Sequence, residues 1–373
     1  MGGGKGRALV TGGAGLIGSH LTDLLIERGY EVTILDNLEP QTHAEGKPRW
    51  IHRDARFIQG DIRNESDLRQ ALEEVRFVFH EAAFGGFTEE SSKYLDVNGV
   101  GTARIFEVVA SGKFSVEKVV VASSQAVYGE GAYQCEKDGL QFPASRSLNQ
   151  LQKKAWEPLC PRCQKPLQPA LTGEEKFPAA ETPYALSKEL EEKFSLTQGK
   201  KLGIPVVALR YAVTYGPRQS VFNPYTGVVS IFSTRLLNDL PPLVYEDGRQ
   251  ARDFVYVGDV ARVNLFILEN SQANGQAFNV STGKATSILN LAQKLALRYQ
   301  KSIEPEIPGQ FRLGDVRHIL PDPSRLNALG FSTQTSLDEG LGRFVEWIRT
   351  QGSLKDYFTR AHRRLKEGGI VHG

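Results

Sequence analysis

Short apolar runs alternate with longer amphipathic stretches through the first half of the chain. Such alternation is typical of β–α–β units, in which helices connect parallel strands. The apolar runs predict strands at Arg7 to Thr11, Glu31 to Leu35, Phe57 to Gln59, Phe77 to His80 and Lys118 to Ala122. The amphipathic stretches predict helices at Leu16 to Arg28, Glu65 to Leu72 and Tyr94 to Ala110. We therefore expect an α/β fold with a doubly wound parallel sheet of the Rossmann type.

The alternation breaks between about Glu130 and Pro183, where prolines, glycines and all three cysteines lie. We interpret residues 130–182 as an insertion. Regular alternation returns with a predicted helix from Pro183 to Thr197 and a strand from Val206 to Arg210, and shorter elements follow. We expect residues 1–210 to form the Rossmann domain. Residues 211–373 would form mainly a smaller α/β substrate-binding subdomain, with some segments returning to the Rossmann sheet.

Composition and charge narrow the class of protein. The chain has 373 residues, of which 40% are hydrophobic and 24% charged, as in folded globular proteins. A formal net charge of +2 lacks the basic surplus that nucleic-acid binding would require. We see neither a signal peptide nor a run of about 20 apolar residues that could span a membrane. Three cysteines, an odd number, suit a reducing compartment. We expect a cytoplasmic protein that binds neither nucleic acid nor membrane.

Gly12, Gly15 and Gly18 stand at GxxGxxG spacing between the first predicted strand and the first predicted helix. In that context the glycines allow a tight turn and a close approach to a pyrophosphate, which the helix N-terminus attracts. A glycine-rich turn without a ligand is the alternative. Asp36 ends the second strand, where a carboxylate accepts hydrogen bonds from the adenine ribose and repels a 2′-phosphate. Together these features predict NAD rather than NADP.

The ends of the third and fourth strands offer further cofactor contacts. Asp61 could hydrogen-bond adenine, although an N-cap role on the next helix is the alternative. Ala82 and Ala83 are small, so their backbone could lie against the cofactor. His80 is interpreted as a packed polar residue and is given no role.

Tyr184 and Lys188 lie one turn apart on the same face of a predicted helix. Such pairs also occur by chance on solvated helices, but this pair follows a dinucleotide motif and a strand that ends in Ser123 and Ser124. A free tyrosine has a pKa of about 10, and a nearby ammonium favours the phenolate. We expect Tyr184 to take the hydroxyl proton while hydride leaves the same carbon for NAD. Ser124 would hold the reacting oxygen and Lys188 would reach the nicotinamide ribose. Serines bonded only to backbone are the alternative.

With these motifs the chain resembles the extended short-chain dehydrogenase/reductase family of nucleotide-sugar epimerases, dehydratases and decarboxylases. The resemblance runs from Arg7 to about Trp347, except for the insertion. Its matches are TGGAGLIGSH, VVVASSQAVYGEG, YALSK, LRYAVTYGPRQ, GRQARDFVYVGDVA, NVSTGKATSI and RLGDVRHILPD. It implies Ser124, Tyr184 and Lys188 as catalytic residues. Dehydratases of the family carry an Asp-Glu pair after the catalytic Thr, where this chain has Gln125 and Ala126, so dehydration is not expected.

The same resemblance implies further contacts. Arg252 would bind the diphosphate of a sugar nucleotide, Asp315 would touch its ribose, and Asn98 would position the active site through a water or the backbone. Alternatively, Arg252 and Asp253 form a surface pair and Asp315 makes a turn. The expected cofactor-binding residues are Gly12, Gly15, Leu16, Ile17, Gly18, Asp36, Asn37, Asp61, Ile62, Ala82, Ala83, Asn98, Tyr184 and Lys188. The expected substrate-binding residues are Ser124, Tyr184, Arg218, Asn223, Arg252 and Asp315.

A finer resemblance, to the dTDP-L-rhamnose 4-epimerase group, implies oxidation at C4, rotation of the 4-keto sugar and return of hydride to its opposite face. It rests on Gly216 to Gln219, Asn223 to Gly227, Ser233 to Leu243, and the segments around Gln150-Leu151 and Trp156 to Pro158. The product would be dTDP-6-deoxy-L-talose. One alternative is UDP-glucose 4-epimerase or another UDP-sugar-modifying member, which would differ in the pocket for C6. Phe84 and Phe87 are candidate apolar liners there. A non-catalytic nucleotide- or RNA-binding relative is the remote alternative.

Family resemblance also implies a homodimer through a four-helix bundle, with Tyr94 to Ala110 and Pro183 to Thr197 as the candidate helices.

The cysteines of the insertion raise the question of a metal. Cys160 and Cys163 have the C-x-x-C spacing of a zinc knuckle, and Cys135 could supply a third thiolate. No histidine lies between His80 and His318, so the fourth ligand would have to be Asp138 or Glu136. Free cysteines or a labile disulfide are favoured over zinc, and we expect no metal site.

Overall fold

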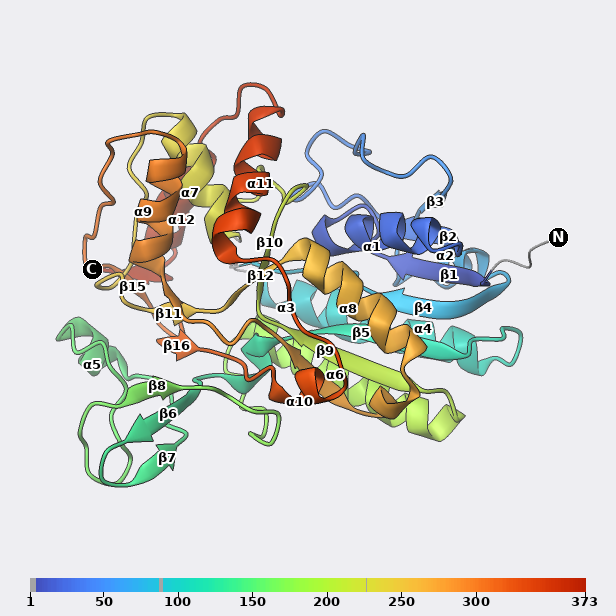
Figure 1. Cartoon of the computed structure of the whole chain (residues 1–373), viewed down its shortest axis with the longest axis horizontal. Coiled ribbons are helices and arrows are strands. Elements are labelled where there is room, and N and C mark those ends of the chain that lie inside the picture. The colour runs from blue at the N-terminus through green and yellow to red at the C-terminus, as the bar shows by residue number, and fades with distance from the viewer. Residues whose placement is uncertain (1–4, 87–89, 226) are drawn as a thin grey trace.

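The computed structural model describes residues 5–86, 90–225 and 227–373. A seven-stranded, fully parallel sheet runs through the protein (Figure 1). Its strands, in order across the sheet, are β13 (Ala277–Val280), β9 (Val206–Tyr211), β5 (Lys118–Ser124), β4 (Val75–His80), β1 (Arg7–Thr11), β2 (Glu31–Asp36) and β3 (Arg56–Gln59). The order reverses between β1 and β4, so the sheet is doubly wound and has a crevice at the carboxyl ends of its strands. The predicted fold class is confirmed.

Three strands run beyond the ends predicted for them. Asp36, Ser124 and Tyr211 each continue the strand, because their backbone still pairs with the neighbouring strand. A prediction from apolar runs stops at the first polar residue, whereas a parallel ladder depends on backbone groups alone. The additional residues all lie at the edge of the sheet where a ligand would bind.

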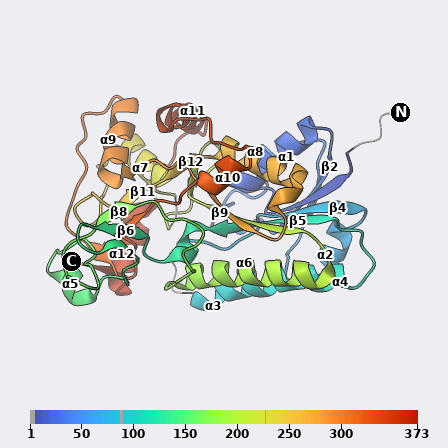
Figure 2. The same cartoon turned by 60° about the horizontal axis from the view of Figure 1, so that its bottom comes forward.

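Helices cover both faces of the sheet (Figure 2). One face carries α1 (Leu16–Glu27) and α8 (Val257–Glu269), and the other carries α2 (Glu65–Ala71), α3 (Ser91–Tyr94), α4 (Thr102–Ala110) and α6 (Pro183–Leu202). Helix α6 begins at the N-cap Thr182, whose side chain accepts a hydrogen bond from the N–H of Ala185, and it ends at the left-handed Gly203. Among the described residues, no helix is both long and apolar enough to cross a lipid bilayer.

The segment predicted as one helix from Tyr94 to Ala110 contains an irregular turn. Residues Leu95–Gly101 form a π-helical turn between α3 and α4. The chain packs closely there, because a Cβ on Gly101 would lie 2.5 Å from Ile62 Cδ1 and one on Gly99 would lie 3.0 Å from Leu190 Cδ2. Turns of this kind are frequent at functional sites.

The remaining elements form a second part beside the carboxyl edge of the sheet (Figure 1). Its helices are α7 (Val228–Leu237), α9 (Ile288–Arg298), α11 (Leu337–Arg349) and α12 (Phe358–Glu367). The short helix α10 (Ser324–Ala328) instead returns to the large sheet, where its Leu326 packs in the same cluster as Phe278 of β13. Its short strands form three small sheets. Strand β10 (Val213–Tyr215) pairs with β12 (Phe254–Tyr256), and β15 (Phe311–Arg312) pairs with β17 (Val371–His372). Strand β11 (Ala251–Arg252) lies between β14 (Thr286–Ser287) and β16 (His318–Ile319). Short 3-10 turns also occur, at Gln125–Tyr128 and Ser271–Ala273.

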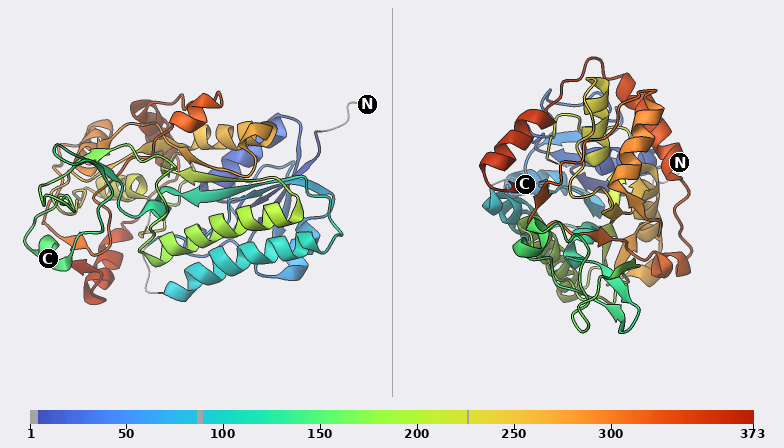
Figure 3. Two further views of the ribbon diagram at one scale, coloured as in Figure 1. Left: turned by 90° about the horizontal axis from the view of Figure 1, so that it is seen from below. Right: turned by 90° about the vertical axis from the view of Figure 1, so that its left-hand side faces the viewer.

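The segment where the alternation breaks folds into a small unit that projects from the molecule (Figure 3). It contains β6 (Ala132–Cys135), β7 (Gly139–Gln141), α5 (Leu148–Gln152) and β8 (Gln168–Ala170). Its three strands form an antiparallel sheet in the order β7-β6-β8, separate from the large sheet.

A buried ion pair joins α6 to the central sheet. Arg210 of β9 donates Nε and Nη2 hydrogen bonds to the carboxylate of Glu192, at 3.0 and 2.6 Å. Ser123 of β5 donates to the same carboxylate at 2.6 Å, and Arg210 also donates to the Tyr128 hydroxyl at 2.8 Å. The two charged side chains are only 7% and 4% exposed. The network therefore sets the position of α6 relative to the ends of β5 and β9.

We expect Glu192→Ala to lower the free energy of unfolding by about 3 to 5 kcal/mol, because it leaves the Arg210 guanidinium buried without a carboxylate. Urea denaturation followed by fluorescence measures this loss. Lys193→Ala is the matched control, since Lys193 on the same helix pairs with Glu189 but is 61% exposed, and its loss should stay below about 1 kcal/mol. Equal losses would contradict the role of the buried pair.

Candidate active site

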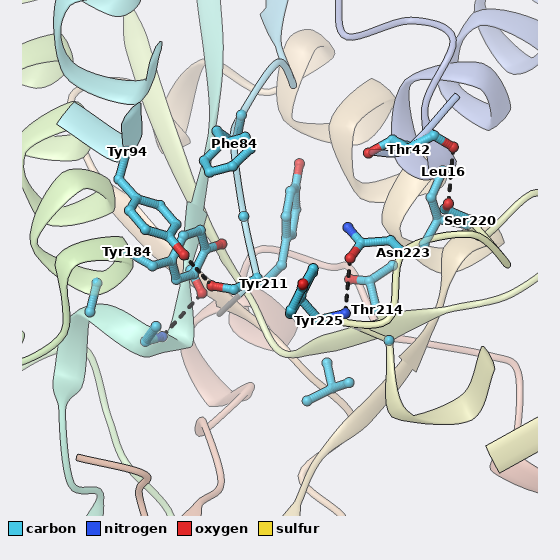
Figure 4. Close-up of a pocket in the computed structure, with 18 of the residues that line it drawn as sticks. Leu16, Thr42, Phe84, Tyr94, Tyr184, Tyr211, Thr214, Ser220, Asn223 and Tyr225 are labelled. Carbon is cyan, nitrogen blue, oxygen red and sulfur yellow. Dashed lines mark hydrogen bonds between the residues drawn. The ribbon is translucent and has the colours of Figure 1, made fainter. Parts of the chain in front are cut away.

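A cavity of about 870 Å³ lies at the carboxyl ends of the strands, on both sides of the point where their order reverses. Residues that follow β1, β2, β4, β5 and β9 line one wall, and residues around Arg252 and Asp315 line the other. Figure 4 shows Tyr184, Tyr94 and Phe84 facing this space opposite Asn223 and Tyr225. Open α/β sheets bind their ligands at this position.

The three glycines before and within α1 each permit a different close approach. Gly12 has φ +68°, and a Cβ there would lie 2.8 Å from the backbone of Ala82. A Cβ on Gly18 would lie 2.4 Å from the Gly12 carbonyl oxygen, which would prevent the helix from packing on its strand. A Cβ on Gly15, the N-cap of α1, would meet only that same carbonyl oxygen, at 3.3 Å, among the described atoms. The turn thus leaves room for a pyrophosphate at the helix N-terminus.

Asp36 lies where the sequence predicts a contact with a ribose. Its carboxylate accepts hydrogen bonds from the N–H groups of Ala14 and Leu38, at 3.0 and 2.9 Å, and it lines the cavity. A carboxylate has about four acceptor positions, so it retains capacity for ligand hydroxyls.

Asp61 also lines the cavity, and its alternative role as an N-cap is wrong. The N-cap of α2 is Asn64, whose side chain accepts from the N–H of Ser66. Asp61 instead forms an ion pair with Arg63 at 2.7 Å and accepts from Asn37 Nδ2 at 3.0 Å. Its hydrogen bonds with Arg63 lower its pKa to about 2, so the carboxylate is charged at neutral pH.

Asn98 does not line the cavity, so its inclusion among the cofactor contacts needs correction. The side chain is fully buried; its Oδ1 accepts from the Phe84 N–H at 2.7 Å, and its Nδ2 donates to the Phe84 carbonyl oxygen and to Ser187 Oγ. These bonds join the loop after β4 to α6 behind the cavity wall. Asn98 is therefore a positioning residue that acts through the backbone.

The structure brings two of the expected catalytic residues, Ser124 and Tyr184, to one cavity. Ser124 ends β5, and its Oγ accepts from the Ala126 N–H at 3.1 Å, which leaves its own hydrogen to donate. The Tyr184 ring lies near the ring of Tyr94, with centroids 6.2 Å apart. A Cβ on Gly85 would lie 3.5 Å from the Tyr184 ring, so glycine keeps that side of the ring open.

Lys188 lies behind the cavity wall, not on it. Its side chain is 2% exposed, and its Nζ donates to Glu191 Oε2 at 2.6 Å. Its expected contact with a nicotinamide ribose stays a prediction. A buried ammonium takes the nearest carboxylate because an unpaired charge in the interior is costly. His80, as expected, is a packed polar residue, bonded to Thr11 and Thr102 at 2.8 Å.

Glu81, a partly buried residue whose carboxyl group lines the cavity, was not predicted from the sequence. Its Oε1 accepts from the Tyr211 hydroxyl at 2.9 Å, and that hydroxyl accepts from Asn264 Nδ2 at 2.8 Å. Burial raises the pKa of Glu81 to about 7, and burial also raises that of Glu191 to about 7. The one signal in the sequence was an acid directly after a buried strand, at the edge where ligands bind.

Arg252 presents a guanidinium to the second wall of the cavity. It donates to three backbone carbonyl oxygens, of Ala251, Arg317 and Val316, at 2.9, 3.0 and 2.7 Å. Asp315 lines the same wall and pairs with Arg312 at 2.7 Å. In the described part of the chain no ion pair joins Arg252 to a carboxylate, so its charge is suited to an anionic ligand.

Asp253 is no surface partner of Arg252. It is fully buried and accepts hydrogen bonds from the N–H groups of Thr282 and Lys284, at 3.0 Å. The alternative of a surface pair is therefore wrong.

Of the other two expected substrate contacts, only Asn223 lines the cavity. Its Oδ1 accepts from Gln41 Nε2 at 3.1 Å and from the Tyr225 N–H at 3.0 Å. Arg218 forms an ion pair at 2.7 Å with Asp23 on α1 and does not line the cavity, so its substrate role stays a prediction. Phe84 lines the cavity, whereas Phe87 lies outside the described residues.

Comparisons with known proteins agree with this geometry. A model of the NAD dependent epimerase/dehydratase family matches residues 8–281. The dTDP-L-rhamnose 4-epimerase of Burkholderia thailandensis is 34% identical over 363 residues, which cover 94% of this chain and 97% of that protein. The solved UDP-glucose 4-epimerase of Thermotoga maritima with UDP-glucose is 30% identical, with a TM-score of 0.76 over 92% of this chain and 99% of that one. The UDP-glucuronic acid 4-epimerase of Bacillus cereus, solved with UDP-glucuronic acid and NAD, is 26% identical, with the same TM-score and coverage.

The raised pKa of Glu191 predicts a pH-dependent contribution to stability. A carboxyl group whose pKa rises on folding stabilises the fold fully below its unfolded pKa and loses that contribution as the pH rises through its folded pKa, here about 7. Relative to Glu191→Gln, the free energy of unfolding of the wild type should fall by roughly 3 kcal/mol between about pH 4.5 and pH 7.5.

Urea denaturation at a series of pH values, without added ligand, measures this difference. Glu189→Gln on the same helix is the control for replacing a carboxyl by an amide, because Glu189 is in contact with solvent. The prediction fails if the difference between wild type and Glu191→Gln does not change with pH.

Proposed function

Because this chain belongs to the NAD-dependent epimerase/dehydratase family, we propose that it inverts C4 of a nucleotide-activated sugar. The observation that carries the proposal is that Ser124 and Tyr184 line the same cavity as the glycine turn and Asp36. A proton-transfer group thus shares one space with a dinucleotide cradle. The second wall, with Arg252, adds a cation for a diphosphate. In this proposal residues 1–210 hold the cofactor, and residues 211–373 mainly hold the sugar nucleotide.

NAD is the proposed cofactor, and the residues present fit it. The open side of Gly15 at the N-terminus of α1 suits the pyrophosphate, and Asp36 suits a ribose diol while repelling the 2′-phosphate of NADP. When bound, NAD accepts a hydride from the substrate and gives it back. The proposed contacts are Gly12, Gly15, Leu16, Ile17, Gly18, Asp36, Asn37, Asp61, Ile62, Ala82 and Ala83, which all line the cavity.

Tyr184 would move the proton. As the hydrogen on C4 leaves with its electron pair, the Tyr184 oxygen takes the hydroxyl proton, and the C4–OH group becomes a ketone. Ser124 donates a hydrogen bond to that oxygen and holds it in place. After the sugar rotates, Tyr184 would return the proton to the C4 oxygen as C4 is reduced from its opposite face. The net reaction inverts C4 and consumes no oxidant.

Lys188 lies one helical turn from Tyr184, and its positive charge would stabilise the negative charge that develops on the Tyr184 oxygen during proton transfer. Its partner Glu191 matters here, because an ionised carboxylate at 2.6 Å offsets the field of the ammonium. With its pKa raised to about 7, Glu191 is partly protonated near neutral pH. The ammonium then acts on Tyr184 with less opposition.

For the substrate we propose dTDP-L-rhamnose, which would become dTDP-6-deoxy-L-talose. The similarity to the Burkholderia enzyme over most of both chains supports this, as does the apolar ring of Phe84 in the cavity wall, which suits a 6-deoxy sugar. The similarity to UDP-glucose and UDP-glucuronic acid epimerases supports a UDP-sugar as the second candidate. Dehydration is not proposed, because Gln125 and Ala126 line the cavity where an acid pair would be needed.

We also propose a homodimer in the cytoplasm. Helix α6 and the segment around α4 lie side by side on one face of the molecule (Figure 3). This face carries the exposed apolar side chains Leu95, Val100, Leu186 and Leu190, each 46–49% exposed. A second copy packed there would bury them. The three free thiols suit a reducing compartment.

Proton NMR of dTDP-L-rhamnose incubated with the purified protein tests the reaction and the substrate. We expect a second set of hexose resonances to grow to a fixed ratio. Its appearance without added NAD would show that the cofactor is retained. If UDP-glucose or UDP-glucuronic acid is epimerised and dTDP-L-rhamnose is not, the nucleotide assignment is wrong. If no sugar nucleotide is converted even with NAD, the epimerase proposal itself fails.

Tyr184→Phe is expected to slow turnover by about 10²- to 10⁴-fold, because phenylalanine cannot carry the proton. Affinity for the sugar nucleotide, measured by calorimetry, should change little. Tyr30→Phe is the matched control, since Tyr30 is buried, lies away from the cavity and donates to Glu269. Unchanged turnover in Tyr184→Phe would exclude the proposed mechanism.

A further inference from the structure

The insertion brings three thiols and one carboxylate into a single cluster. Cys135 ends β6, Asp138 lies in the turn that follows, and Cys160 and Cys163 come from the loop between α5 and β8. One side-chain ligand atom from each residue lies within 4.8 Å of the others. Residues more than 20 positions apart therefore meet at one point.

The separations within the cluster are those of ligands around one ion. Around a tetrahedral zinc ion, two sulfurs lie about 3.8 Å apart and a sulfur and an oxygen about 3.6 Å apart, from the usual bond lengths. Here the sulfurs of Cys135 and Cys163 are 3.5 Å apart, and Asp138 Oδ2 lies 3.5 and 3.2 Å from the sulfurs of Cys135 and Cys160. A disulfide requires about 2.05 Å, so the thiols are grouped without being bonded.

The backbone presents the four groups from two matching turns. Strands β6 and β7 pair with Cys135 opposite Gly139, so Cys135 and Asp138 stand three positions apart at one tight turn. Cys160 and Cys163 have the same spacing at a second turn. That turn is closed by a bridge between Leu159 and Pro166 and by the Cys160 N–H, which donates to the Lys165 carbonyl oxygen at 2.8 Å. The pattern is C-x-x-D facing C-x-x-C, which differs in one ligand from the paired C-x-x-C turns of zinc sites.

Apolar packing does little to hold the insertion together. Its buried cluster consists of Tyr133, Cys135, Cys160 and Leu167, with Cys163 packed against it. Larger apolar side chains such as Leu140 and Phe142 are 51% and 46% exposed. Half of that core is thus cysteine, and folded units this small usually need a metal or a disulfide.

We propose that Cys135, Asp138, Cys160 and Cys163 bind one structural zinc ion. Protein groups fill all four tetrahedral positions, which is typical of structural rather than catalytic zinc. None of the four residues lines the cavity of the active site. The proposal replaces the expectation of no metal, because Asp138 supplies the fourth ligand that the cysteine spacing alone lacks.

The zinc site would steady one wall of the active-site cavity. Glu157, three residues before Cys160, accepts from Arg317 Nη2 at 2.6 Å and contacts His318 Nε2 at 3.0 Å. The Arg317 carbonyl oxygen accepts a hydrogen bond from Arg252. The insertion thus contacts, through Glu157, the segment that holds the proposed diphosphate-binding arginine.

A second contact comes from Arg146 of the insertion. It pairs with Glu246 at 2.9 Å and donates to the Asp315 carbonyl oxygen at 2.8 Å. The zinc ligands would therefore only hold the insertion in position against the cavity wall, and they would take no part in the reaction.

Metal analysis of the full chain, purified without a metal-affinity tag, tests the site directly. Inductively coupled plasma mass spectrometry should find about one zinc ion per chain. Chelation should lower the melting temperature of the wild type. A protein without zinc, even after refolding in its presence, would overturn the proposal, as would a disulfide between these cysteines found by mass spectrometry under non-reducing conditions.

Substitutions in the turn after β6 test whether Asp138, rather than a neighbouring residue, is the zinc ligand. Asp138→Cys should retain zinc, because it completes a second C-x-x-C turn, whereas Asp138→Ala should lose most of it. Glu136→Ala is the matched control, since Glu136 is an exposed acid in the same turn and lies outside the cluster. Loss of zinc in Glu136→Ala, or in Asp138→Cys, would overturn the assignment of ligands. Zinc content is measured independently of any sugar substrate, so failure here and failure of the epimerase proposal are distinguishable.

Discussion

The structure depends on the pairing of ionisable groups buried between α6 and the central sheet. Lys188, Glu191, Glu192 and Arg210 are all removed from water, where an unpaired charge would cost several kcal/mol. Lys188 and Glu191 pair within the helix, whereas the pair of Glu192 with Arg210 of β9 joins the helix to the sheet and fixes one arrangement of the two. That arrangement places Tyr184, at the start of α6, in the same cavity as Ser124, at the end of β5. The geometry proposed for proton transfer thus follows from the pairing of the buried ionisable side chains.

The opposite wall of the cavity is held by a second buried network. Arg317 is fully buried and forms ion pairs with Glu157, Glu246 and Asp247 at 2.6–2.7 Å. These partners come from the insertion and from the loop before β11. Their contacts support Arg252, which donates to the Arg317 carbonyl oxygen. The insertion is therefore part of the frame that shapes the proposed nucleotide-sugar side.

Positions in the cavity could be predicted from the sequence where they follow from local spacing. The glycine turn, Asp36, Tyr184 and the end of β5 were placed correctly at the cavity, and the family resemblance is confirmed. Positions could not be predicted where a side chain chooses among distant partners. Arg218 pairs with Asp23 on α1, and Glu81, which no motif marked, lines the cavity and accepts from Tyr211.

By itself, the sequence determined the parallel α/β fold and the glycine turn, because both follow from periodicity and from residue types close together in the chain. Tertiary structure alone decided that Arg210 pairs with Glu192 and that the two cysteine-bearing turns of the insertion meet. Those choices rest on burial and on contacts between separate elements. Spacing along the chain does not carry that information, since a charge in the interior takes whichever partner the packing brings within reach.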